Sequence, residues 1–356
     1  MKRKILSAMV MIAGSCSAWV SASYAGELTL VSWGGAYGKS QQEAFVKPFS
    51  AKTSHKVMVE DYSGGLAQIR AQVKTGNVTW DVVDLELQDA LRACDEGLLQ
   101  PLNVKDLEPA ADGSPAAGDF VAGAVSGCTI GSVMWANIIA FDVSRFKNAQ
   151  PKSVRDFFDV KNFPGKRGMR KSPKANLEWA LLADGVAAEE IYKTLSTPAG
   201  VERAFKKLDT LKPHIVWWET GAQAPQLLAD GEVVMTSAYN GRIQDAIGRD
   251  RKAFKIIWDG QIPVFETFAI VKGSKNQTVA REFIKFATAP QNLAAQTRFI
   301  SYGPLRKSAV TLVDEAIKPQ LPTLPQNMKT AIPINGEWWA DNIDDLNQRF
   351  AVWLNK

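Results

Sequence analysis

The sequence predicts an α/β protein built from two domains, and three observations lead to this expectation. Apolar runs rich in β-branched residues alternate with segments whose apolar residues recur at helical spacing. The strand pattern restarts after Phe141 and returns at Phe265. The chain of 356 residues is also long enough for two domains of ordinary size after an N-terminal leader is removed.

The N-terminus has the layout of a secretory signal peptide. A basic stretch at 2–4 precedes an apolar run at 5–20, and small residues occupy the minus-three and minus-one positions of a cleavage site after Ala25. A membrane anchor is the alternative, but Gly14 interrupts a run that is already short for a span. Cys16 raises a lipoprotein alternative, although its lipobox is poor. We therefore expect export to the periplasm and cleavage after Ala25.

Charge argues against a nucleic-acid partner. Of the 42 basic residues, three lie in the leader, which has no acidic residue, so 39 basic residues remain beside 37 acidic ones. A nearly neutral mature chain with scattered basic residues lacks the electrostatic footprint of a nucleic-acid binder. We expect a monomer.

Two cysteines, Cys94 and Cys128, remain after the leader is removed. In an oxidising compartment such a pair can form a disulfide. Two buried free thiols are the alternative.

The first part of the mature chain alternates strands and helices. We expect strands at 28–33, 56–60 and 80–85 and helices at 37–51 and 65–74. This order implies a parallel sheet covered by helices. Ligands bind beyond the carboxyl ends of such strands, which here are Trp33-Gly34-Gly35, Asp61-Tyr62-Ser63 and Leu85-Glu86-Leu87-Gln88.

The second part begins after a surface loop at 106–118. A buried strand is expected at 132–141. The elements that follow are helices near 153–158, 177–182, 187–195 and 200–211; strands at 214–217, 233–236, 254–258 and 265–271; helices at 279–289 and 290–299; and a mostly helical tail from 309.

Several short motifs resemble the extracellular solute-binding family of spermidine/putrescine ABC importers. Each motif is weak, but their order and spacing together are specific. They are Ser32-Trp33-Gly34-Gly35-Ala36-Tyr37; Trp80-Asp81-Val82-Val83 followed by Cys94 to Leu102; Ser237-Ala238-Tyr239-Asn240-Gly241; Glu266 to Gly273; and Ser301-Tyr302-Gly303-Pro304.

The resemblance implies a two-lobed periplasmic binding protein of the type II-like kind. Each lobe is a mixed sheet flanked by helices, and hinge closure traps a ligand in the cleft between the lobes. The implied lobes are 26–135 plus 268–308 and 138–263 plus 309–356, with hinge strands near 135–138 and 263–267. The implied function is to bind a small amine of the putrescine and spermidine class for an inner-membrane ABC permease.

The resemblance also suggests ligand-binding residues. Carboxylates would hold a protonated amine, and aromatic faces would contact its methylenes. Glu266 is the main acidic candidate, Glu86 the second, and Glu178 is equally well read as an exposed helical residue. The remaining candidates are Trp33, Tyr37, Gln88, Trp218, Tyr239 and Tyr302.

Two positions depart from the polyamine pattern. Val264 stands two residues before Glu266, where polyamine binders often have tryptophan. Arg242 follows Tyr239-Asn240-Gly241 at the edge of the expected cleft. A guanidinium there would repel a diamine but clamp a carboxylate. An ω-amino acid such as γ-aminobutyrate is therefore the alternative ligand, unless Arg242 points to solvent or pairs with an acid.

An enzyme is the third hypothesis and has little support. The two histidines, His55 and His214, fall at predicted strand starts, away from the expected ligand side. We find no nucleophile elbow, metal-ligand spacing or phosphate-binding glycine motif. We expect no catalytic residue, no metal and no cofactor.

Overall fold

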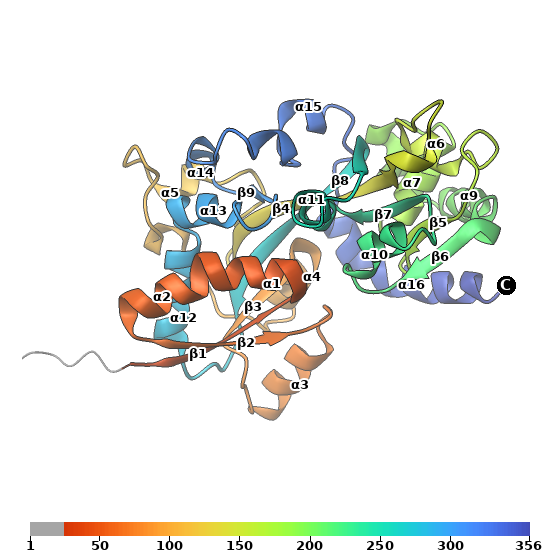
Figure 1. The fold of residues 1–356 in the computed structure, drawn as a ribbon. Coiled ribbons are helices and arrows are strands. Elements are labelled where there is room, and N and C mark those ends of the chain that lie inside the picture. The colour runs from red at the N-terminus through yellow and green to blue at the C-terminus, as the bar shows by residue number, and fades with distance from the viewer. Residues whose placement is uncertain (1–24) are drawn as a thin grey trace, which may run out of the picture.

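The computed structural model describes residues 25–356, and the signal-peptide prediction lies almost entirely outside them. Two lobes sit at either end of a long pair of central strands, which Figure 1 shows running between the left and right halves of the molecule. The two-lobed architecture expected from the sequence is therefore confirmed. Among the described helices, none combines the length and the apolar character needed to cross a bilayer.

Nine strands form one connected sheet with the order β2-β1-β3-β8-β4-β7-β5-β6, and β9 pairs with β4. In lobe 1, β1 pairs in parallel with β2 and β3; in lobe 2, β5 pairs in parallel with β6 and β7. The strands are β1 Glu27–Ser32, β2 Lys56–Asp61, β3 Val82–Glu86, β4 Thr129–Asp142, β5 Arg167–Arg170, β6 Ile215–Trp218, β7 Met235–Tyr239, β8 Phe254–Ile270 and β9 Gly303–Pro304.

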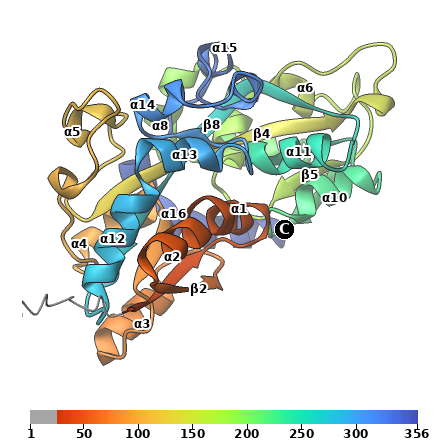
Figure 2. The ribbon, with the colours of Figure 1, turned by 60° about the vertical axis from the view of Figure 1, so that its left-hand side comes forward.

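Helices cover the faces of this sheet, as the apolar helical spacing predicted. In lobe 1, α12 packs beside α2 (Figure 2), with the rings of Phe49 and Phe283 5.3 Å apart. The helices are α1 Gly35–Gln41, α2 Lys47–Thr53, α3 Ala67–Thr75, α4 Leu87–Asp95, α5 Ala116–Asp119, α6 Val154–Phe158, α7 Asn176–Ala183, α8 Ile191–Leu195, α9 Pro198–Asp209, α10 Gln223–Ala229, α11 Asn240–Gly248, α12 Gln277–Ala287, α13 Pro290–Gln296, α14 Lys307–Thr311, α15 Pro325–Met328 and α16 Gly336–Leu354.

The structure departs from the expected elements in several places, and helices α4, α10 and α11 were not expected at all. The helix expected at 37–51 spans α1 and α2, joined by a π-helical turn at Gln42–Val46. The strands expected at 254–258 and 265–271 are one strand, β8, in which Gly260 adopts a positive φ of 62° and Pro263 still faces Ala136. β5 was not expected, because its sequence Arg-Gly-Met-Arg has no run of apolar residues.

The strands β4 and β8 carry the chain across the lobe boundary side by side. They pair antiparallel from Thr129 to Asp142, with register shifts between Gly131 and Met134 and between Asn137 and Ile139. The shift between Asn137 and Ile139 adjoins the stretch 135–138 expected as part of the hinge, and the hinge itself stays a prediction.

The C-terminal segment is divided between the lobes. Ala309 packs in the core of lobe 1, and Val313 and Leu321 pack with Ala294 of α13. Trp339 and Trp353 of α16 belong to the main core of lobe 2. The lobe boundary proposed at 309 thus comes earlier in the chain than this change of packing.

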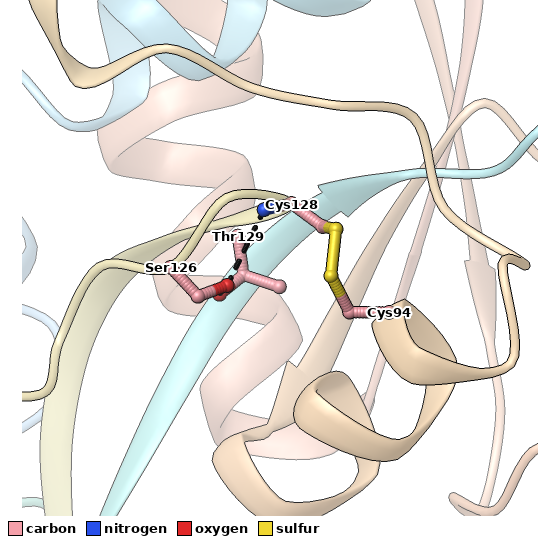
Figure 3. Close-up of a disulfide and its surroundings, with 4 residues drawn as sticks. All are labelled: Cys94, Ser126, Cys128 and Thr129. Atoms are coloured by element: carbon pink, nitrogen blue, oxygen red, sulfur yellow. Dashed lines mark hydrogen bonds between the residues drawn. A yellow bond between two sulfur atoms is a disulfide. The ribbon is translucent and has the colours of Figure 1, made fainter.

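A disulfide joins Cys94, in the last turn of α4, to Cys128, just before β4 (Figure 3). The Cα atoms are 5.9 Å apart, and the closed loop spans a sequence separation of 34. Such a cross-link restricts the unfolded chain more than the folded one. It ties the end of α4 to the start of a central strand.

Replacing both cysteines by serine should lower the free energy of unfolding by about 3–4 kcal/mol, the value that the chain-entropy model gives for a loop of this length. Urea unfolding of the mature protein with and without reductant measures this. Reductant should destabilise the wild type and leave Cys94→Ser/Cys128→Ser unchanged. An equal response of the two proteins would contradict the cross-link.

Candidate functional site

A cleft lies where the two lobes meet, and its empty space, part of which is open to solvent, is about 610 Å³. Its walls come from the carboxyl ends of β1, β2, β3, β5, β6 and β7, from α11, and from the central strands. The structure brings seven of the ten predicted ligand-binding residues together there: Trp33, Tyr37, Glu86, Tyr239, Arg242, Glu266 and Tyr302.

Glu266 occupies the lobe 1 side of the cleft and is held in a fixed orientation. The indole N–H of Trp33 donates to its Oε2 (3.1 Å), and the indole N–H of Trp135 donates to its Oε1 (2.6 Å). Glu266 is 2% exposed, and within residues 25–356 no cation lies within salt-bridge distance of it. Burial first, and then the nearby carboxyls of Asp84 and Glu86, raise the pKa of Glu266 well above its usual value.

Asp84 is a buried carboxyl behind Glu266 that sequence reasoning did not single out. The amide of Gln41 donates to its Oδ2 (2.6 Å), and the hydroxyl of Ser32 donates to the same oxygen (3.2 Å). Burial raises the pKa of Asp84 to about 7 despite these hydrogen bonds. Asp84 and Glu266 therefore form a pair of carboxyls that favours sharing a proton over carrying two charges.

Glu86 differs from these two because it has a cation of its own. It is paired across the lobe interface with Lys174, and Gln88 donates to its Oε2 (2.5 Å). Burial by itself would raise the pKa of Glu86, but the charges of Lys174 and Arg170 outweigh it and hold the pKa below its usual value.

The opposite wall, from lobe 2, carries two guanidinium groups. Arg170 ends β5 and lies over the ring of Tyr239, 5.8 Å from its centroid. Arg242 lies in the first turn of α11, and its Nε is buried with no hydrogen-bond partner among the described residues. Neither Arg170 nor Arg242 has an ion-pair partner within the described chain.

Two glycines leave room for Arg242. A Cβ on Gly35, which has a φ of 58°, would lie 2.5 Å from Arg242 Nη1. A Cβ on Gly221 would lie 2.7 Å from Arg242 Nε and 2.6 Å from the ring of Tyr239. Side chains at either position would displace the guanidinium, so both glycines define where it lies.

Aromatic rings line the space between the two charged walls. Trp33 packs on Tyr62 with centroids 4.9 Å apart, and Trp135 meets Tyr239 edge to face at 4.5 Å. Tyr37 and Tyr302 are 5.4 Å apart. Such faces suit the methylene groups of a ligand chain and the ammonium at its end.

Three predicted residues lie outside the cleft. Gln88 contacts the cleft only through its hydrogen bond to Glu86. Glu178 is fully buried in lobe 2, where the indole of Trp339 (2.8 Å) and the hydroxyl of Tyr192 (3.0 Å) donate to it, so the exposed-helix alternative is also wrong. Trp218 is buried behind Tyr239, with ring centroids 5.6 Å apart.

Sequence reasoning missed four residues that line the cleft: Trp135, Arg170, Thr220 and Gly221. Tyr62 and Ser63, which also line it, follow the second predicted strand. Trp135 lies opposite Val264 on the neighbouring strand. An indole is therefore present beside the position where polyamine binders often have tryptophan. Arg170 was missed because the strand that carries it was missed.

The arrangement is that of a binding site for a small charged molecule. It combines an enclosed, largely aromatic space with a few fixed polar groups of both signs. Its opening lies between two lobes that are connected by the strands forming its floor, which is the arrangement required for closure around a ligand.

The chain belongs to the family of bacterial extracellular solute-binding proteins, whose model matches residues 44–325. It is the solute-binding component of an ABC importer and not an enzyme. A γ-aminobutyric acid-binding protein from Pseudomonas aeruginosa is 44% identical, over 92% of this chain and 90% of its own length.

Solved structures agree on the fold. A binding protein from A. tumefaciens in complex with glucopine has a TM-score of 0.84 at 28% identity, covering 92% of this chain and 99% of its own. A GABA receptor has a TM-score of 0.81 at 32% identity, and the match covers 92% of this chain and 97% of the receptor chain. The expected family is thus confirmed at the level of solute binding. Its narrower spermidine/putrescine branch is represented by a Streptococcus pneumoniae protein at 17% identity, a likeness in fold alone.

Asp84 should contribute a loss of stability to the ligand-free protein as pH rises from about 4 to 7. The pKa of Asp84 is about 7 when folded and near 3.8 when the chain is unfolded, so the folded state holds an extra proton in this window. The state that binds more protons is disfavoured as pH rises, and this contribution is lost by pH 7.

Urea unfolding at several pH values checks this. In Asp84→Asn the free energy of unfolding should fall less steeply as pH rises. The raised pKa of Glu266 contributes to the fall that remains. Asp341→Asn, on the exposed side of α16, should leave the wild-type profile unchanged. Identical profiles for wild type and Asp84→Asn would contradict the raised pKa.

Proposed function

We propose that this protein binds an ω-amino acid, with γ-aminobutyrate as the leading candidate, in the periplasm and delivers it to an inner-membrane ABC permease. The observation that carries the proposal is the separation of charge across the cleft. Carboxyls lie on the lobe 1 side, and two guanidinium groups without acidic partners among the described residues lie on the lobe 2 side. A zwitterion matches both walls at once.

The ammonium of the ligand would bind at Glu266. Its carboxyl lies beside the rings of Trp33 and Trp135, which donate to it and leave its charge facing the cavity. An ammonium there would be paired with a carboxylate and surrounded by aromatic faces, which together are its preferred environment in proteins. It would also relieve the repulsion between Glu266 and Asp84.

The carboxylate of the ligand would bind at Arg170 and Arg242. A planar guanidinium offers two parallel N–H groups to a carboxylate, so each can form a bidentate pair. The methylene groups would cross the ring of Tyr239 between the two ends. The γ-aminobutyric acid-binding relative at 44% identity supports this choice of ligand class.

A diamine such as putrescine is the second candidate. Glu86 lines the cavity together with Glu266 and is a second carboxylate for a second ammonium. Against it, Glu86 already pairs with Lys174, and Arg170 and Arg242 would both repel a dication. We therefore favour the ω-amino acid.

Export follows from the membership of the chain in an extracellular solute-binding family. The position of the signal-peptide cleavage is part of this proposal. Ala25 and Gly26 precede β1 at the surface of lobe 1, with Ala25 exposed. Cleavage between them would leave the folded body intact. The N-terminal mass of the secreted protein tests the position of the cut.

Calorimetric titration of the mature protein tests the ligand. γ-Aminobutyrate should bind, n-butylamine and n-butyrate should bind at least about a hundredfold more weakly because each leaves one charged wall unpaired, and putrescine should also be weaker. Tighter binding of putrescine than of γ-aminobutyrate would contradict the assignment.

Arg242→Gln and Glu266→Gln should each weaken γ-aminobutyrate binding by about tenfold to a hundredfold, since a buried charge of the ligand loses its partner. Arg249→Gln is the matched control: Arg249 directly follows α11 but is exposed and pairs with Asp245. Equal affinities for Arg242→Gln and Arg249→Gln would remove Arg242 from the site.

A further inference from the structure

Glu86 and Glu266 stand directly opposite each other on neighbouring antiparallel strands. β3 pairs with β8 in a register that places Glu86 against Glu266. Like charges at such positions destabilise a sheet, and burial strengthens their repulsion. Each carboxylate at this point needs a cation of its own.

Lys174 supplies that cation to Glu86 from the other lobe. It lies in the turn that leads into α7, and its ammonium pairs with Glu86 Oε2. The side chains of Lys174 and Glu86 are only 7% and 8% exposed. Lys174 does not line the cavity; it reaches Glu86 from an adjoining hollow, whereas Glu86 lines both spaces.

The pair changes the charges that a ligand meets. With Lys174 in place, the negative charge of Glu86 is already compensated, which leaves Glu266 as the carboxylate available to an ammonium. The pair also keeps Glu86 from forming an ion pair with Arg170, which is the second cation whose charge lowers the pKa of Glu86. Arg170 consequently stays free to meet a ligand carboxylate.

We propose that Lys174 is a specificity-determining residue that selects ligands with one ammonium and one carboxylate over diamines. This inference rests on the proposed function. The ammonium of Lys174 already pairs with Glu86. Glu86 is the carboxylate that the second ammonium of a diamine would need. Lys174 acts through Glu86 and is therefore a positioning residue that does not touch the ligand.

Removing the ammonium of Lys174 should change both the affinity for diamines and the affinity for ω-amino acids. Glu86 would regain an uncompensated charge facing the cavity, which favours a dication. Part of the time it would pair with Arg170, which weakens the hold on a ligand carboxylate. Both effects move the ratio of affinities in the same direction.

The experiment is calorimetric titration of the mature protein with γ-aminobutyrate and with putrescine. Lys174→Met should shift the ratio of the two dissociation constants toward putrescine by about tenfold or more, the change expected for one buried charge. Lys174→Arg keeps the charge and should keep the ratio close to wild type. If Lys174→Met does not fold, as judged by thermal melting, Lys174→Gln replaces it.

Two further variants separate charge from structure. Lys174→Met/Glu86→Gln removes both charges of the pair and should return the ratio toward wild type. Asp344→Asn breaks the ion pair between Asp344 of α16 and Arg92 of α4, which also joins the lobes but is exposed. It should change both affinities alike, because it alters closure and not the charges at the cavity.

The possible outcomes are distinct. Wild-type protein that prefers putrescine would overturn the proposed function and this inference with it. Wild-type protein that prefers γ-aminobutyrate, combined with an unchanged ratio in folded Lys174→Met or Lys174→Gln, would overturn the inference alone. An equal loss of both affinities in these variants would show that Lys174 serves lobe closure only, which also overturns it.

Discussion

Three carboxyl groups, Asp84, Glu86 and Glu266, lie together on β3 and β8 at the point where the lobes meet, and their mutual repulsion governs this site. The protein relieves it in two ways. Glu86 keeps its charge because Lys174 pairs with it across the interface. Asp84 and Glu266 have no such cation in the described chain, and burial raises the pKa of both. A ligand ammonium would provide the compensating charge.

The same strands that carry this charge also connect the lobes. Glu266 lies on β8 and Trp135, which donates to it, lies on β4, close to the register shifts where the two strands cross between the lobes. Arg170 and Arg242 approach from lobe 2. A ligand that spans both walls favours the closed arrangement by its contacts to each, which couples binding to hinge closure.

Local patterns in the sequence were sufficient for most of the fold. The alternation of strands and helices located β1 to β4 and the helices α1 to α3, because each has a clear apolar period, whereas α4 was not expected. β5 escaped detection since its four residues include two arginines and a glycine, and its position depends on pairing with β6 and β7. β8 was divided in two because Gly260 and Pro263 resemble a turn, although the ladder with β4 accommodates both.

The candidate site was predictable where a residue follows a recognisable strand end or motif, as for Trp33, Glu86, Tyr239 and Glu266. Glu178 and Trp218 were misplaced because a buried structural residue and a ligand-binding residue look the same in a sequence. The partners that set the charge of the site, Asp84 and Lys174, depend on contacts between segments far apart in the chain. No local pattern reports such contacts.

In the ligand-free protein the buried carboxyls of Glu266 and Asp84 should hold a proton that a ligand ammonium displaces. Calorimetry of γ-aminobutyrate binding at pH 7, in two buffers with different ionisation enthalpies, measures the protons exchanged. We expect net proton release, because a bound cation lowers the pKa of both carboxyls. The release should be smaller in Glu266→Gln. Binding without proton exchange, or with proton uptake, would exclude a displaceable proton at Glu266 and Asp84.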